Sequence, residues 1–178
     1  EQGYHVSAIF MNNWVADPDD HCQARIDYHD AQRVCDHLQI ALDYVDFAEE
    51  YWAKVFSRCL DLYRLGITPN PDIWCNKEIK FGVLLHYAQQ LGAQLLATGH
   101  YAQLGLQDGV YTLRKAVDDT KDQSYFLSTL TQAQLSCSMF PLGALRKLAV
   151  RSLARQIGLP NHAKKDSVGI CFIGQRNF

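Results

Sequence analysis

The sequence predicts an α/β protein built on a partial doubly wound parallel sheet, followed by part of a smaller domain. Over residues 4–98, short apolar segments of strand type alternate with amphipathic segments of helix type. After residue 101 the pattern changes to a hairpin and shorter helices. The composition, 48% hydrophobic and 20% charged, indicates a globular protein that can bury a core.

The first predicted elements are a strand, a helix and a strand. Residues 4–11 (YHVSAIFM) are mostly apolar and rich in aromatic and β-branched types, which favours a buried strand. The Asp-rich stretch 17–20 is expected to make a turn and to cap a helix over about 21–38. Residues 41–47 predict a second, short strand.

Two helices and a strand complete the predicted sheet domain. Apolar residues between 51 and 63 recur at helical spacing, and Gly66 ends that helix. A loop over 66–72 leads to a further helix that ends at Gly92, and a short strand at 94–98 follows. The order strand, helix, strand, helix, helix, strand is typical of a doubly wound sheet.

The second part of the chain begins with a hairpin, because two alternating segments flank the turn residues Gln107-Asp108-Gly109. Thr131 opens the capping-box pattern T-Q-A-Q. The expected elements are, in order, strands at 101–106 and 110–115, a loop at 116–123, a short helix near 124–130, and a final helix at 145–157 ended by Gly158 and Pro160.

Charge is divided unevenly along the chain, although the net charge is only −2. Residues 1–75 carry 5 Lys or Arg and 13 Asp or Glu, whereas residues 76–178 carry 12 and 6. Basic clusters of this kind suit a phosphate backbone, although a solvated helix face explains any single cluster equally well. The clusters are Lys77/Lys80, Arg114/Lys115/Lys121, Arg146/Lys147/Arg151/Arg155 and Lys164/Lys165.

Location and redox state follow from what the sequence contains. No run approaches the roughly 18 apolar residues of a membrane span, and the N-terminus lacks a secretory pattern, so we expect a cytoplasmic protein with no membrane partner. The six Cys include no C-x-x-C pair, which favours a reducing compartment. Cys35 and Cys59 fall in amphipathic patterns and are expected to be buried. The start at Glu1 and the end at Phe178 favour a piece of a longer chain.

The most unusual stretch is 68–80, in which two prolines precede a helix. Asp72 falls where this helix needs its N-cap, which makes Cys75 the third helical residue. Backbone N–H groups and the helix dipole favour a thiolate there, so Cys75 is a candidate nucleophile and Asp72 a candidate proton donor or acceptor. An ordinary capped helix with an inert cysteine is an equally good interpretation.

Three further segments are candidate sites. Cys171 lies between glycines on a basic loop, as a persulfide carrier would require, although loop cysteines are common. Gly99 follows a strand at the carboxyl edge where ligands bind, and the adjacent His100 is expected to be a hydrogen-bonded structural residue. Residues 121–124 (KDQS) suit phosphate contact, and a plain helix start explains them nearly as well.

Several segments resemble those of bacterial tRNA-specific 2-thiouridylases, the MnmA family. They run in order along the chain: FMNNW (10–14), DAQRVCDHL (30–38), TPNPDIWCNKEIKF (68–81), ATGHYA (97–102), KDQSYFL (121–127), FPLG (140–143) and KKDSVGICFIGQRNF (164–178). The resemblance implies a Rossmann-like fold of the adenine nucleotide α-hydrolase type. It also implies a PP-loop ATP pyrophosphatase that adenylates the C2 oxygen of the wobble uridine of tRNA and replaces it with sulfur.

The resemblance also implies a role for each matching residue. Cys75 would be the catalytic nucleophile and Cys171 the persulfide carrier, the two forming a transient disulfide, with Asp72 as acid or base. The other implied contacts are Asn70, Pro71 and Asp72 with the target base, Lys121, Asp122 and Gln123 with tRNA, and Met11 and Gly99 with ATP. Mg²⁺ and a sulfur-relay persulfide donor protein are implied partners. Residues 1–120 would form the PP-loop-type domain and 121–178 the start of a central tRNA-contacting domain.

One motif of the family is missing from these residues. The pyrophosphate loop, S-G-G-x-D-S, is expected upstream of Tyr4, and the chain contains no Gly-Gly pair. The 178 residues alone are therefore expected not to hydrolyse ATP. Rival interpretations are a PP-loop enzyme with another substrate, a non-catalytic RNA-binding module, and a redox protein with a reversible disulfide.

Overall fold

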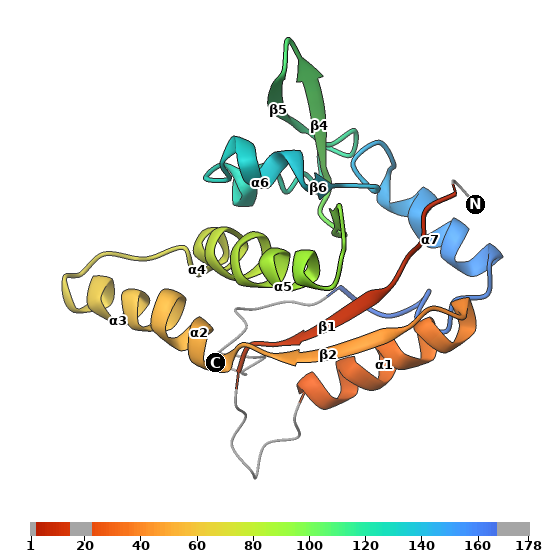
Figure 1. Ribbon diagram of the computed structural model, residues 1–178, viewed down its shortest axis with the longest axis horizontal. Helices are drawn as coiled ribbons and strands as arrows, with labels where there is room; N and C mark the ends of the chain where they lie inside the picture. Colours follow the sequence, from red (N-terminus) through yellow and green to blue (C-terminus); the bar gives the residue numbers. More distant parts are fainter. Residues whose placement is uncertain (1–2, 15–22, 167–178) are drawn as a thin grey trace. The chain divides into compact units, whose positions relative to one another are not determined.

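The computed structural model describes residues 3–14 and 23–166, and Figure 1 traces their helices and strands. The chain divides into two compact units, one formed by residues 1–49 with 151–178 and the other by residues 50–150. The predicted boundary after residue 120 separates two domains of the family, and these are not the same thing as the two compact units. The boundary stays a prediction.

The first unit contains a parallel strand pair covered by a helix. Strands β1 (Ala8–Asn12) and β2 (Leu42–Asp46) pair in parallel, with Ala8 opposite Leu42 and Asn12 opposite Asp46. Helix α1 (Gln23–Leu38) connects them and packs against both strands. Tyr28 of α1 makes edge contacts with Phe10 and Tyr44, at centroid distances of 5.2 and 5.5 Å. This strand–helix–strand order confirms the prediction.

One predicted boundary in this unit is wrong, and another lies outside the described residues. The strand expected over 4–11 begins only at Ala8, because residues 4–7 are exposed and no described residue pairs with them as a strand. The Asp-rich turn expected at 17–20 and the predicted helix start at 21 lie outside the described residues. Strand β2 lies within the predicted range of 41–47.

The second unit is built on two helical runs, each of which includes a π-helical segment. The first run is α2 (Ala48–Tyr51), η1 (Trp52–Phe56) and α3 (Ser57–Arg64), and the second is α4 (Pro71–Trp74), η2 (Cys75–Leu84) and α5 (Leu85–Gln90). Gly66 and Gly92 follow them with φ of +73° and +89°, as expected for helix-ending glycines. The π-helical geometry was not predicted from the spacing.

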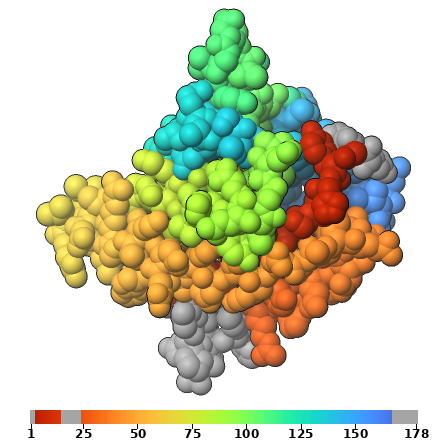
Figure 2. Space-filling model, in the orientation of Figure 1, coloured from red at the N-terminus to blue at the C-terminus, as the bar shows by residue number. Residues whose placement is uncertain are grey.

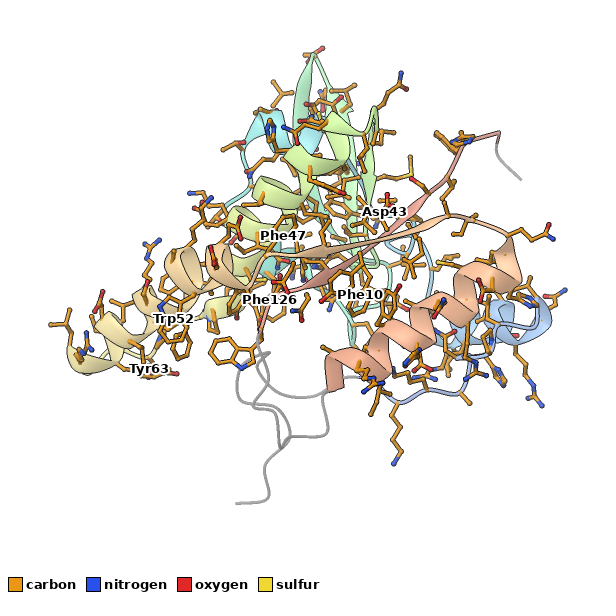
Figure 3. All side chains as sticks on the ribbon, turned by 60° about the horizontal axis from the view of Figure 1, so that its bottom comes forward. Phe10, Asp43, Phe47, Trp52, Tyr63 and Phe126 are labelled. Atoms are coloured by element: carbon orange, nitrogen blue, oxygen red, sulfur yellow. The ribbon has the colours of Figure 1, made fainter. Side chains whose placement is uncertain are left out.

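The packing of these runs explains their buried apolar positions. Segments η1 and η2 contact each other, and Trp52 and Tyr63, both labelled in Figure 3, extend from the first run. Cys59 is 1% exposed, and its burial raises the pKa of the thiol against the opposing effect of Arg58. Cys35 in the first unit is also buried. The predicted structural role of these two cysteines is therefore confirmed.

Short strands and a hairpin complete the second unit. Strands β3 (Leu96–Ala97) and β6 (Ser138–Met139) pair in parallel, and β4 (Ala102–Gln107) pairs antiparallel with β5 (Val110–Lys115). The hairpin projects from its unit in Figure 1. Its two turn residues, Asp108 and Gly109, have φ of +50° and +77°, which suits a type I′ turn.

The remaining helices are close to the prediction. A 3-10 helix, η3 (Ser124–Leu127), stands where a short helix was expected. Helix α6 (Gln132–Ser136) begins at Thr131 with a complete capping box, and α7 (Lys147–Gln156) ends before Gly158, whose φ is +74°. The core of the second unit contains Phe81, Ala102, Leu127 and Phe140.

The α/β class is confirmed. Within the described residues the parallel strands form two separate pairs, β1–β2 and β3–β6, rather than one continuous sheet. Helices accompany both pairs, so the architecture is a partial α/β fold.

Candidate functional site

The segment that carries Cys75 starts its helix two residues earlier than predicted. Asn70, rather than Asp72, is the N-cap: its Oδ1 accepts hydrogen bonds from the backbone N–H of Asp72 (3.2 Å) and Ile73 (3.4 Å). Pro71 takes the first helical position, where its missing N–H costs nothing. Asp72 is therefore the second helical residue and Cys75 the fifth.

This shift changes the environment of the thiol. The backbone N–H of Cys75 donates to the carbonyl oxygens of Pro71 and Asp72, so it is not one of the unsatisfied N–H groups of the helix start. The Cys75 side chain is only 4% exposed. The predicted N-cap at Asp72 and the predicted place of Cys75 as the third helical residue are therefore wrong, whereas its role as a nucleophile stays a prediction. Asp72 and Cys75 do share the first turns of one helix.

The capping role of Asn70 can be measured. Asn70→Ala is expected to lower the free energy of unfolding by about 1 kcal/mol, because Asp72 and Ile73 lose their side-chain acceptor. Asn70→Ser, which keeps a capping oxygen, should retain most of that stability. Urea denaturation of the three proteins compares them, and equal stability of the Ala variant would contradict the capping assignment.

The helix of Cys75 is joined to the segment 124–127 by side-chain amides. Asn76, which is 2% exposed, donates from Nδ2 to the carbonyl oxygen of Phe126 at 3.1 Å. Asn70 Nδ2 donates to the hydroxyl of Tyr125 at 3.4 Å. Phe126 is labelled in Figure 3. The structure thus brings together two segments that lie about 50 positions apart, as the separations of these pairs show.

The predicted tRNA contacts Asp122 and Gln123 are held in place by backbone groups. Asp122 Oδ1 accepts from the Ala116 N–H at 2.8 Å, and Gln123 Oε1 accepts from the Tyr101 N–H at 3.0 Å. Burial raises the pKa of Asp122, and hydrogen bonds from Ala116 and Ser124 outweigh it, so the net shift is downward. Lys121 is half-buried beside them. These side chains fix the loop, and a role in binding would come in addition.

A further backbone hydrogen bond places Gly99 near this loop. The backbone N–H of Gln123 donates to the carbonyl oxygen of Tyr101 at 2.8 Å, two residues after Gly99. Gly99 is exposed and follows β3, as predicted. A Cβ there would meet only Leu142 Cδ1, at 3.9 Å, so the protein itself leaves room on this residue.

His100 has the structural environment that the sequence favours. Its Nδ1 is 2.8 Å from Thr98 Oγ1, and its ring lies about edge-on to Phe140, with centroids 6.1 Å apart. Burial, assisted by the charge of Lys80, lowers the pKa of His100 to about 4. The imidazole is therefore neutral at physiological pH.

This pKa predicts an acid-sensitive fold. The unfolded chain protonates His100 near its ordinary pKa of 6.5, and the folded chain only near 4, so the stability it contributes is present above pH 6.5 and falls as the pH drops towards 4. Between pH 7.5 and pH 5 this loss should reach about 2 kcal/mol. His100→Gln should lose less over the same interval in urea denaturation. Identical losses in both proteins would contradict the assignment.

Two candidate residues remain, Met11 and Cys171. Met11 is half-buried on β1 in the first unit, opposite Val45 of β2. Cys171 lies outside the described residues, as does its predicted basic loop beyond residue 166. The implied disulfide between Cys75 and Cys171 therefore stays a prediction.

Some cations of the basic half are already paired. Lys164 Nζ lies 2.7 Å from Asp27 Oδ1 and 2.6 Å from Asp30 Oδ2, and these carboxylates raise the pKa of Lys164. Arg151 pairs with Asp166 at 3.1 Å. These two cations stabilise the fold locally and contribute less to a phosphate surface than their place in the sequence suggested.

Among residues 3–14 and 23–166, no group of three His, Cys, Asp or Glu side chains could hold a metal ion, so no described residue is assigned to Mg²⁺. None of the helices in the described part of the chain is long and apolar enough to cross a membrane.

Sequence reasoning missed the hydrogen bonds of Asn76 and Gln134 to distant segments, although Gln134 belongs to the predicted capping box. Gln134 Nε2 donates to the carbonyl oxygens of Lys77 and Phe81 at 3.0 and 2.9 Å, which joins α6 to η2, and Figure 2 shows the surfaces of these segments in contact. Both residues are polar side chains directly next to an apolar residue, Cys75 or Leu135, that is buried. That signal marks a buried hydrogen bond, but it does not identify the partner.

Comparison with known proteins identifies the family of this chain and several relatives. The family described as tRNA methyl transferase HUP domain matches residues 1–175. Proteins named tRNA-specific 2-thiouridylase MnmA from Bacillus thuringiensis (strain Al Hakam), Bacillus cereus (strain Q1) and Bacillus anthracis are each 54% identical over 179 residues. The alignments cover all of this chain and 48% of each relative, so the chain spans about half the length of these relatives. The match over nearly every residue places this chain in the tRNA methyl transferase HUP domain family.

Proposed function

We propose that this chain takes part in the ATP-dependent transfer of sulfur to C2 of the wobble uridine (position 34) of tRNA, which forms 2-thiouridine. The observation that carries the proposal is the 54% identity, over the whole chain, to relatives named tRNA-specific 2-thiouridylase. Both cysteine segments, TPNPDIWCNKEIKF and KKDSVGICFIGQRNF, are present. The activity would be that of a tRNA-uridine 2-sulfurtransferase.

The residue roles in this proposal follow the predicted site. Cys75 is the nucleophile, Cys171 carries the persulfide, and Asp72 moves a proton beside the target base. Asn70 and Pro71 contact the base, while Lys121, Asp122 and Gln123 contact tRNA. The bond from Asn70 to Tyr125 supports this grouping, because it brings the segment of Cys75 beside residues 121–127. Met11 and Gly99 would bind the nucleotide part of ATP.

The proposed reaction cycle is balanced when a thiol reductant regenerates the two cysteines. ATP adenylates the C2 oxygen of uridine and releases pyrophosphate. The terminal sulfur of the Cys171 persulfide attacks C2, and AMP leaves with the oxygen. The Cys75 thiolate then attacks the Cys171 sulfur, the S–S electron pair goes to the sulfur on C2, and a Cys75–Cys171 disulfide forms. A thiol of the cell reduces this disulfide, and a persulfide donor protein reloads Cys171.

The burial of Cys75 adds a requirement to this scheme. Cys75 is 4% exposed, so the protein shields it from solvent and a bulky substrate such as tRNA reaches it only after local movement. Cys75 stands at the junction of α4 and the π-helix η2, and π-helical turns are common at functional sites. We infer that binding of tRNA opens this junction. Residues 1–120 would belong to the nucleotide-binding domain and residues 121–178 to the beginning of the tRNA-contacting domain.

A reconstituted reaction tests the proposal. The protein at its full natural length is incubated with an unmodified tRNA transcript, ATP with Mg²⁺, a persulfide donor and a thiol reductant, and the digested nucleosides are measured by mass spectrometry. We expect 2-thiouridine at position 34, dependent on ATP. A methylated nucleoside instead would support the activity that the family description names. Tight tRNA binding without any modified nucleoside would favour a non-catalytic RNA-binding module.

A further inference from the structure

Asn76 is a buried amide directly beside the proposed nucleophile. Its side chain is 2% exposed and follows Cys75 at the start of η2. Its Nδ2 donates to the carbonyl oxygen of Phe126 at 3.1 Å. Within the described residues this bond and that from Asn70 to Tyr125 are the side-chain hydrogen bonds seen between the helix of Cys75 and η3.

Stability does not explain why an asparagine occupies this position. Its Oδ1 is buried, and no group among the described residues hydrogen-bonds it. A buried acceptor without a partner costs about 1–3 kcal/mol, which offsets the bond that Nδ2 makes. An apolar side chain would bring no unpaired acceptor of its own to this buried position. The amide is therefore better explained by the connection that it makes between the helix of Cys75 and Phe126.

The segment on the other side of the bond is anchored independently. Gln123 exchanges hydrogen bonds with the backbone of Tyr101, and Asp122 accepts from Ala116. Loss of the Asn76 amide would leave these anchors, and the predicted tRNA contacts on them, in place. Loss of the Asn76 amide would instead remove a bond that fixes the position of Cys75 relative to that segment.

We propose that Asn76 is a positioning residue that holds Cys75 in register with residues 121–127. The inference rests on the proposed function. Small displacements of a reacting group cost much more in turnover than in substrate binding. Removing the amide should therefore lower kcat for tRNA thiolation about tenfold and leave the KM for tRNA unchanged.

Two variants and a matched control test this in the protein at its full natural length. Asn76→Leu keeps the branching at Cγ in a larger side chain and removes the donor, and Asn76→Ala removes the donor with a smaller side chain. Gln134→Leu is the control, because Gln134 also donates to carbonyls of η2 but, within the described residues, makes no hydrogen bond to residues 121–127. Each protein is measured by thiolation kinetics and by thermal denaturation.

The outcomes separate the two proposals. Lower kcat with unchanged KM in the Asn76 variants, and wild-type kcat in Gln134→Leu, would support the positioning role. Wild-type kcat in a folded Asn76 variant would overturn it. Unfolding of both Asn76 variants at a temperature where Gln134→Leu stays folded would also overturn it, since Asn76 would then act on folding. An inactive wild-type protein would instead overturn the proposed function.

Discussion

Replacing Cys75 by serine is expected to abolish 2-thiouridine formation by the protein at its full natural length, with a loss of at least about 100-fold. The hydroxyl of serine is a far poorer nucleophile than a thiolate, and it cannot form the disulfide that releases sulfur from the Cys171 persulfide. Binding of tRNA should persist, because the other proposed contacts remain. Mass spectrometry of nucleosides measures the product, and a gel-shift titration measures binding.

Cys59→Ser provides the matched control for this prediction. Cys59 is buried on α3 and its thiol has a raised pKa, so it shares the burial of Cys75 without a proposed chemical role. The control should retain thiolation at a temperature where it is folded. Normal thiolation by Cys75→Ser would exclude the nucleophile assignment. Equal loss in both variants would point to damage of the fold.

The elements of this protein could largely be predicted from its sequence because their signals are local. Gly66, Gly92 and Gly158 take positive φ where the helices end, and Asp108-Gly109 forms the expected turn. The capping box at Thr131 is complete. Each of these features depends on a few neighbouring residues.

The errors arise where geometry depends on competition between neighbours or on distant partners. Asn70 and Asp72 are both good N-caps, and Pro71 decides between them because proline suits the first helical position. The spacing of apolar residues in the sequence does not distinguish the π-helical segments η1 and η2 from ordinary α-helices. The bonds from Asn76 to Phe126 and from Gln134 to η2 join segments far apart in sequence, so no local spacing predicts them.

The turn after β6 needs a glycine because a side-chain Cβ would not fit there. Gly143 is buried, its N–H donates to the Phe140 carbonyl at 3.2 Å, and its own carbonyl accepts from Val117 at 2.9 Å. A Cβ built on Gly143 would overlap the carbonyl group of Ala102. Ala102 is fully buried in the core with Phe140, so neither side of this contact can move away freely.

Gly143→Ala is therefore expected to lower the free energy of unfolding by at least about 3 kcal/mol, since overlap with backbone in a packed core forces the turn and β4 apart. Gly99→Ala is the control: its new Cβ meets only Leu142 Cδ1 at 3.9 Å, so its stability should stay within about 0.5 kcal/mol of the wild type. Urea denaturation of the three proteins measures the difference. Stability of Gly143→Ala within about 1 kcal/mol of the wild type would show that the turn can shift without disturbing the core beneath it.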